Sequence, residues 1–178
     1  NLDFELAAVL RDRLKALTYI QGSQAINADG VGDADIFALA CKSGVMGIQA
    51  FFIRGGQNWG HRSFFPAHTQ DVPEDEVLAQ FLMQFYEEVP PPRNVLVDRE
   101  LAEAPLLAEA MAERAGFKVA LSVPQRGARR RLMDQATRNA VEALDRRLAE
   151  GTTQAKLLRE VAELFDLAEP PQLSLIHI

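Results

Sequence analysis

Polar side chains gather around glycines in the stretch VMGIQAFFIRGGQNWGHRSFF, residues 45–65. An apolar run ends at Ile53, and cations, amides and an indole follow it. A long turn that carries such groups and exposes backbone N–H groups can hold an anionic partner. A solubilising loop whose indole packs on its own strands is the alternative, because loops lie on the surface in either case. The residues expected to bind the anionic partner are Arg54, Gln57, Asn58, Trp59 and Arg62.

A second group of cations lies between Pro124 and Arg147. This stretch holds seven arginines and three acids, a net charge of +4, whereas the whole chain carries −6 and the remainder therefore −10. The sequence PQRGARRRLMDQA puts Gly127 and free backbone N–H groups at an expected helix start, where a phosphate can bind. A solvated charged face is the alternative. The phosphate contacts are expected from Arg126, Arg129, Arg130 and Arg131.

The spacing of apolar residues, which predicts the strands and helices that position these side chains, changes along the chain. Three apolar strands come first and are expected to form an antiparallel meander, and helices and strands then alternate. Strands separated by helices run parallel, with helices on both faces of one sheet. This βββαβαβα order predicts a mixed α/β sheet of the ribonuclease-H-like class. The predicted ranges are strands 35–41, 45–53 and 62–66, a helix from Pro73 to the prolines at 90–92, strand 94–97, helix 105–115, strand 118–123 and helix 128–149.

Nucleases of this class hold two divalent cations with carboxylates from the middle of the first strand, the first helix and the end of the fourth strand. Asp98 closes the strand NVLV and is the one candidate at such a position. The middle of the first strand reads FALA, while Asp33 and Asp35 lie at its edge. Glu74 and Glu76 suit the positive start of a helix. We therefore interpret Asp98 as a strand-end or capping residue, and we predict no catalytic and no metal-binding residue.

Composition excludes other classes of site. The histidines do not stand at ligand spacing, and no Ser-His-Asp set, Cys-His set or phosphate-binding loop is apparent. Cys41 is the single cysteine, which excludes an internal disulfide and predicts a buried structural thiol in a reducing, cytoplasmic setting. No apolar run is long enough to span a bilayer, so no membrane partner is expected.

Further helices flank the central domain. The segment NLDFELAAVLRDRLKAL, residues 1–17, is amphipathic, and its leucine stripe needs a partner surface. Gly151 is expected to end the long helix, and Thr152 to cap a final one. The predicted organisation is a hairpin helix at 1–20, a linker at 21–34, the central domain at 35–150, a C-terminal helix at 151–172 and a tail at 173–178 that is not native coding sequence.

Several motifs resemble, in order, those of the UvrC family, the incision subunit of bacterial nucleotide excision repair. They are DFELAAVLRDRLKAL, FFIRGGQNWG followed by FFP, QFYEEVPPPRNVLV, SVPQRGARRRL and ALDRRLAEGTTQAKLLREVAELFDLAEPPQ, which together cover about residues 1–172. The resemblance implies a fragment that lies between a GIY-YIG nuclease domain and an active ribonuclease-H-like nuclease with helix-hairpin-helix units. The last six residues, LSLIHI, depart from the family, where an Asp-Asn-Ser-His motif is expected.

The resemblance also implies partners. The first helix is similar to the second half of the UVR motif, by which UvrC docks on UvrB. The fragment is expected to be a non-catalytic scaffold that contacts UvrB and damaged double-stranded DNA. It needs no cofactor, since the divalent metal belongs to the nuclease domains of the parent protein. An active two-metal nuclease and a pure protein-interaction domain stay open as alternatives. The matching positions, expected to contact UvrB, are Phe4, Glu5, Ala8, Arg11 and Asp12.

Overall fold

The molecule is built on a five-stranded mixed sheet. The computed structural model describes residues 31–164, and its strands lie in the order β3-β2-β1-β4-β5. β1 (Ala34–Lys42), β2 (Val45–Arg54) and β3 (Gln57–Phe64) form the predicted antiparallel meander. β4 (Asn94–Val97) runs parallel to β1, and β5 (Ala120–Ser122) runs parallel to β4.

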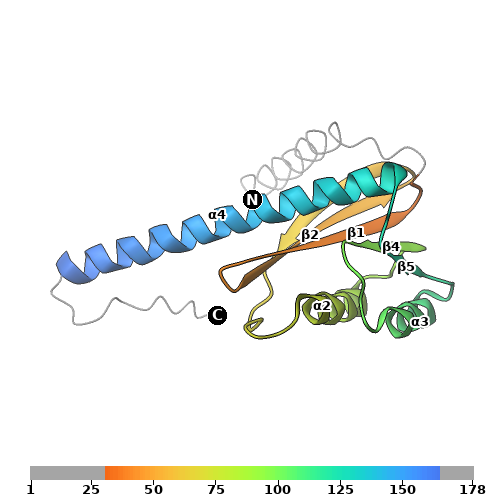
Figure 1. Cartoon of the computed structure of the whole chain (residues 1–178), viewed down its shortest axis with the longest axis horizontal. Helices are drawn as coiled ribbons and strands as arrows, with labels where there is room; N and C mark the ends of the chain where they lie inside the picture. The colour runs from red at the N-terminus through yellow and green to blue at the C-terminus, as the bar shows by residue number, and fades with distance from the viewer. Residues whose placement is uncertain (1–30, 165–178) are drawn as a thin grey trace, which may run out of the picture.

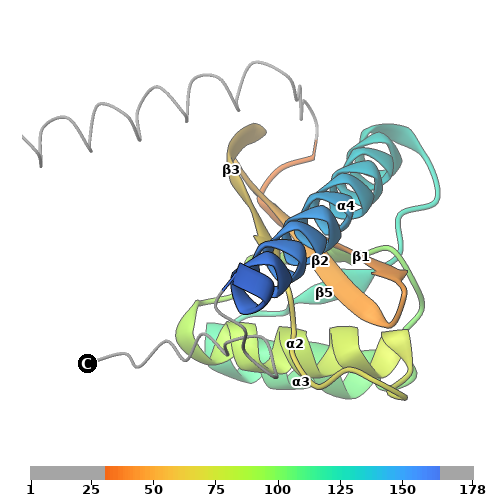
Figure 2. The ribbon, with the colours of Figure 1, turned by 90° about the vertical axis from the view of Figure 1, so that its left-hand side faces the viewer.

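Helices cover both faces of this sheet (Figure 1). α2 (Glu74–Glu88) and α3 (Ala104–Ala115) lie on one face, and α4 (Gly127–Leu164) lies on the other, as the turned view in Figure 2 also shows. The predicted mixed α/β class and its βββαβαβα order are therefore confirmed.

The central strand β1 is apolar on both faces because both faces are covered. Phe37 and Leu39 belong to the core beneath α2 and α3, whereas Ile36 and Ala38 belong to the core beneath α4. α4 runs along β1 from its first residue toward its last, since Met133 packs in the core around Ile36 and Leu144 in the core around Ala40. The N-terminal turn of α4 therefore lies at the end of the sheet where β1 begins.

The turn between β2 and β3 is shorter than the predicted loop. Gly55 and Gly56 have φ angles of 58° and 74° and close a two-residue turn, and β3 begins at Gln57 instead of near Arg62. A type I′ hairpin requires positive φ at both central positions, which glycine adopts without strain. The prediction of a long turn was wrong because the solvent side of an edge strand has the same polar composition as a loop.

α4 continues through Gly151, so the predicted helix end and the separate final helix are wrong. A glycine inside a helix costs only about 1 kcal/mol relative to alanine, which a long helix tolerates. Thr152 donates its hydroxyl to the carbonyl of Leu148, four residues back, which is a helix-interior bond and not a cap. Leu157 is 56% exposed, because this part of α4 extends past the sheet (Figure 1).

Cys41 is exposed, contrary to the prediction of a buried thiol. It lies near the end of β1, two residues after Leu39 and on the same face of the sheet. Leu39 is the last residue of that face in the buried core.

Among the helices of residues 31–164, none has an apolar stretch that could cross a membrane. The predicted first helix with its partner-binding residues, and the tail at 173–178, lie outside the described residues.

Candidate functional site

Two of the predicted binding segments meet at one end of the sheet. Nη2 of Arg129, in the first turn of α4, donates to the carbonyl of Val31 at 3.5 Å. The backbone N–H of Gly55, in the β2–β3 turn, donates to Oδ1 of Asp33 at 2.7 Å. Both segments are thus attached to the short stretch before β1. We call this region the cationic end, defined by the Gly55–Gly56 turn together with Arg126, Arg129, Arg130 and Arg131.

The four arginines at the cationic end differ in the hydrogen bonds and ion pairs that they form within the protein. Arg126 and Arg131 are exposed and make no hydrogen bond or ion pair within residues 31–164. Arg129 is half-buried by its contact with Val31, and Arg130 forms an ion pair with Asp134 at 2.9 Å. A free guanidinium can bind a phosphate without first losing a protein partner. Arg126 and Arg131 are therefore the side chains best able to bind an anion.

Arg54, by contrast, is turned inward. Its Nη1 donates to Oδ1 of the fully buried Asp35 at 2.6 Å and to the carbonyl of Ile53 at 2.8 Å. The other oxygen of Asp35 accepts the hydroxyl of Tyr86 at 2.9 Å. Burial raises the pKa of Asp35, and the bonds from Arg54 and Tyr86 oppose that rise. Arg54 thus neutralises a carboxylate inside the fold, a task that the sequence pattern did not reveal.

The remaining predicted residues lie on the edge strand β3. Gln57, Trp59 and Arg62 are exposed, and the guanidinium of Arg62 lies 5.0 Å from the centre of the Phe64 ring. Asn58 is buried, with 2% of its surface exposed. The structure therefore exposes an indole three residues after the Gly55–Gly56 turn, places Arg62 opposite Ala50 on the α2 and α3 side of the sheet, and withdraws the amide of Asn58 from solvent.

Asp98 is surrounded by protein donors. Its Oδ2 accepts the backbone N–H of Leu39 at 3.0 Å and Nη2 of Arg99 at 2.9 Å, and its Oδ1 accepts Nε of Arg99 at 3.0 Å. The same guanidinium forms an ion pair with Glu74 and donates to the carbonyl of Leu39 at 2.7 Å. Burial lowers the pKa of Arg99, but hydrogen bonds to Asp98 and Glu74 outweigh it and raise the pKa above its ordinary value.

This arrangement does not fit a two-metal centre, which needs several carboxylates open to the same cations. The guanidinium of Arg99 lies between Glu74 and Asp98, and no carboxylate comes from the middle of β1. Asp134 lines a shallow hollow of about 400 Å³ together with Asp98, and it is paired with Arg130. Across residues 31–164, no three His, Cys, Asp or Glu side chains are placed to hold a metal ion. Sequence reasoning noticed Asp98 and Glu74 but missed Arg99, although Arg99 directly follows Asp98.

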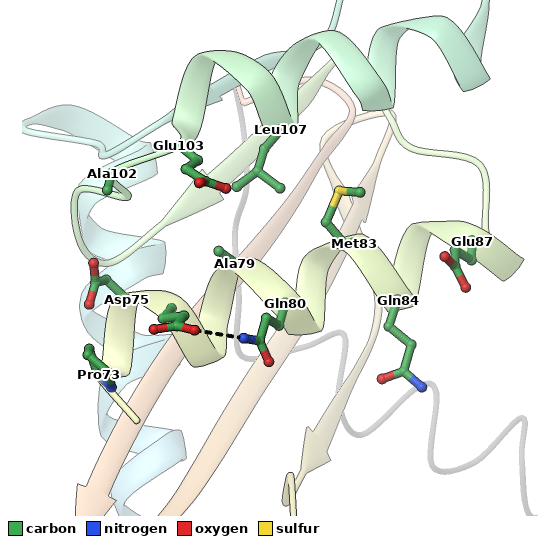
Figure 3. A pocket seen from close by; sticks show the side chains of 11 residues that line it. Pro73, Asp75, Ala79, Gln80, Met83, Gln84, Glu87, Ala102, Glu103 and Leu107 are labelled. Carbon is green, nitrogen blue, oxygen red and sulfur yellow. Dashed lines mark hydrogen bonds between the residues drawn. The ribbon is translucent and has the colours of Figure 1, made fainter. Parts of the chain in front are cut away.

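An acidic groove lies on the face of the sheet opposite α4. A groove of about 660 Å³ lies between α2 and α3 (Figure 3) and has Met83 and Leu107 among its apolar lining residues. No Lys or Arg lines it, so a phosphate backbone would be repelled from this face. The groove thus carries only acidic charge, whereas free arginines lie at the start of α4 on the other face. The acids that line the groove are Asp75, Glu76, Glu87 and Glu103.

Comparison with known proteins agrees with this architecture. The family model described as "UvrC Ribonuclease H-like domain" matches residues 33–147, which confirms the ribonuclease-H-like class. "UvrABC system protein C" of Sphingopyxis alaskensis is 71% identical over 171 residues, covering 96% of this chain and 27% of that protein. The protein of the same name from Novosphingobium aromaticivorans is 69% identical over 172 residues, covering 97% of this chain and 26% of that protein.

The chain thus spans about a quarter of the length of these two relatives. Among solved structures, one titled as the PCNA:RNase HII complex from Archaeoglobus fulgidus aligns over 80% of this chain and 98% of that chain. Its identity is 11% and its TM-score 0.39, which is too low to bear on function.

Proposed function

Because the chain belongs to the UvrC family, we propose that it is a non-catalytic scaffold of the UvrABC excision system, which holds DNA against the cationic end. The observation that carries the proposal is the meeting of the first turn of α4 with the β2–β3 turn, through Val31 and Asp33. The exposed arginines of the first turn of α4 thereby lie at the same end of the sheet as the glycine turn, on an otherwise acidic chain.

The electrostatics favour the sugar-phosphate backbone as the ligand of this surface. Arg126 and Arg131 are exposed and free within the described residues, and the backbone N–H groups of the first turn of α4 add positive potential. Contacts with phosphates are independent of base sequence, and they weaken as salt rises because bound counterions are released. The acidic groove between α2 and α3 directs the polyanion to the α4 side of the sheet.

A scaffold without catalysis agrees with the environment of the carboxylates. Glu74 and Asp98 share one guanidinium, and Asp98 also accepts the N–H of Leu39. Binding a cation between them would require Arg99 to leave four hydrogen-bonding contacts. We therefore assign phosphodiester cleavage to other parts of the family's longer chains.

Docking on UvrB forms the second half of this proposal, and the resemblance of the segment DFELAAVLRDRLKAL to a UVR motif supports it. Because apolar side chains of this segment are expected to bind the partner, Phe4→Ala in the full chain should weaken UvrB binding at least tenfold, as measured by surface plasmon resonance. Asp3→Ala, on the same segment, serves as the control. Equal affinities for the two variants would remove UvrB from the proposal.

The DNA contact is tested by the salt dependence of duplex affinity, measured by fluorescence anisotropy. Each phosphate contact contributes about 0.9 to the slope of log K against log salt, so Arg126→Ala with Arg131→Ala should reduce the slope by about 2. Arg146→Ala is the control for Arg131→Ala, because it removes the same charge from an exposed position roughly 20 Å further along α4. A slope that stays the same in the double variant would refute the cationic end as the DNA surface.

A further inference from the structure

Trp59 is the inserted residue of a β-bulge. In the pairing of β2 with β3, Phe52 is opposite Gly60 and Ile53 is opposite Asn58, so Trp59 has no partner across the ladder. Oδ1 of Asn58 accepts the N–H of Gly60 at 2.9 Å, and Gly60 has a φ of 148°, a region that favours glycine. Bulges at sheet edges re-aim side chains. Here the result is an indole that is 61% exposed.

The arrangement that exposes Trp59 lowers the stability of the fold in two ways. The large apolar surface of the indole stays in water instead of joining the core. Nδ2 of Asn58 is buried and finds no hydrogen-bond partner among the described residues, and such unpaired buried donors are unfavourable. Local arrangements that oppose folding cluster at ligand-binding sites, which makes Trp59 a candidate contact residue.

The surroundings of the indole indicate the chemistry of that ligand. Asn58, which precedes it, is paired with Ile53, and Ile53 packs in the core beneath the first turns of α4. Arg62 is exposed on the same strand, and the Gly55–Gly56 turn of the cationic end lies a few residues before Trp59. An exposed aromatic ring at the same end of the sheet as the exposed arginines of α4 matches a polyanion that itself carries aromatic rings. A nucleic acid has this chemistry, with the phosphates meeting the cations and a base meeting the ring.

We propose that Trp59 stacks on an unpaired base of DNA whose backbone lies on the cationic end. This inference rests on the proposed function and adds a structural preference to it. In an intact duplex both faces of each internal base are already stacked, so the indole finds no free face. A single-stranded or distorted segment offers one, and stacking on it does not depend on which base is present. The arginines thus bind any DNA, and Trp59 favours DNA with exposed bases.

The test uses the fact that Trp59 is the only tryptophan of the chain. Its emission is recorded while the protein is titrated with an oligothymidine, and in parallel with a duplex whose ends are closed by hairpin loops of abasic linker. Oligothymidine should quench the emission strongly, because a stacked base quenches the indole, and the closed duplex should bind with little change.

Variants separate stacking from general binding. Trp59→Ala should weaken the binding of oligothymidine on the order of tenfold, since stacking on an aromatic ring is typically worth that much or more, and leave the affinity for the closed duplex unchanged. Trp59→Phe, which keeps an aromatic ring, should retain most of the affinity for oligothymidine. Far-UV circular dichroism and a thermal melt confirm that each variant is folded.

The outcomes distinguish this inference from the proposed function. Binding of both DNAs without a change in emission would overturn the stacking role and leave the cationic end intact. Equal losses of affinity for both DNAs in Trp59→Ala would also overturn it. Emission that responds to added UvrB but to neither DNA would assign the indole to a protein contact, which again overturns it. Failure of every DNA to bind at low salt would refute the proposed function itself.

Discussion

Arg99→Gln should lower the free energy of unfolding by about 3 kcal/mol, because one guanidinium joins the end of β4, the start of α2 and the middle of β1. Arg99 donates twice to Asp98, once to Glu74 and once to the carbonyl of Leu39. The Asp98 side chain is 10% exposed and would keep only the N–H of Leu39 as a strong donor. Hydrogen bonds to charged groups contribute about 1.5–3 kcal/mol each, and most of the loss falls on Asp98.

The contribution of Glu74 is smaller. Its side chain is 44% exposed, so water replaces the lost cation, and a pair of this exposure is typically worth about 0–1 kcal/mol. A glutamine amide can also restore one bond to Leu39 or Asp98. These offsets hold the total near 3 kcal/mol, instead of the larger figure that a sum over four bonds would suggest.

Urea unfolding followed by far-UV circular dichroism measures this loss, and a thermal melt should show a midpoint lower by about 6–12 °C. Arg130→Gln is the matched control, since it makes the same substitution in the exposed pair with Asp134 and should change stability by less than about 0.5 kcal/mol. Arg99→Lys should fall between, because lysine keeps the charge but not the planar fork. If Arg99→Gln proves as stable as Arg130→Gln, the central role of this guanidinium is refuted.

Two further predictions concern the buried carboxylate and the long helix. Burial raises the pKa of Asp35 above its ordinary 3.8, so its contribution to stability is fullest below that pH and falls as pH rises through the raised value. The unfolding free energy of the wild type minus that of Asp35→Asn should therefore decrease as pH rises above 3.8 and level off above the raised pKa, and a difference that stays constant throughout would contradict the raised pKa. Gly151→Ala should stabilise α4 locally by about 0.5–1 kcal/mol, since the added methyl meets nothing within 4 Å. Hydrogen exchange of the amides around residue 151 should slow, and faster exchange would show that the helix needs this glycine.

Short sequence patterns predicted an element correctly where only one local structure was compatible with them. The four residues of β4 were predicted correctly, because a short apolar run between prolines and a polar turn has few alternatives as a buried strand. The end of α3 at Gly116 was also correct, since its φ of 72° favours glycine at a helix C-terminus. Gly151 carried the same signal but lies inside a helix, because a glycine ends a helix only when the chain beyond it takes another direction.

The sequence by itself determined the order of strands and helices and the number and position of the charged residues. It gathers arginines before and within one helix, and it places a single tryptophan after two glycines. Only the tertiary structure decided which of those groups are free. Arg54 is bound to Asp35, 19 positions away, and Arg99 to Glu74, 25 positions away, whereas Arg126 and Arg131 keep no such partner among the described residues. These pairings depend on strand register and on how helices pack across the sheet, which no local pattern of residues encodes.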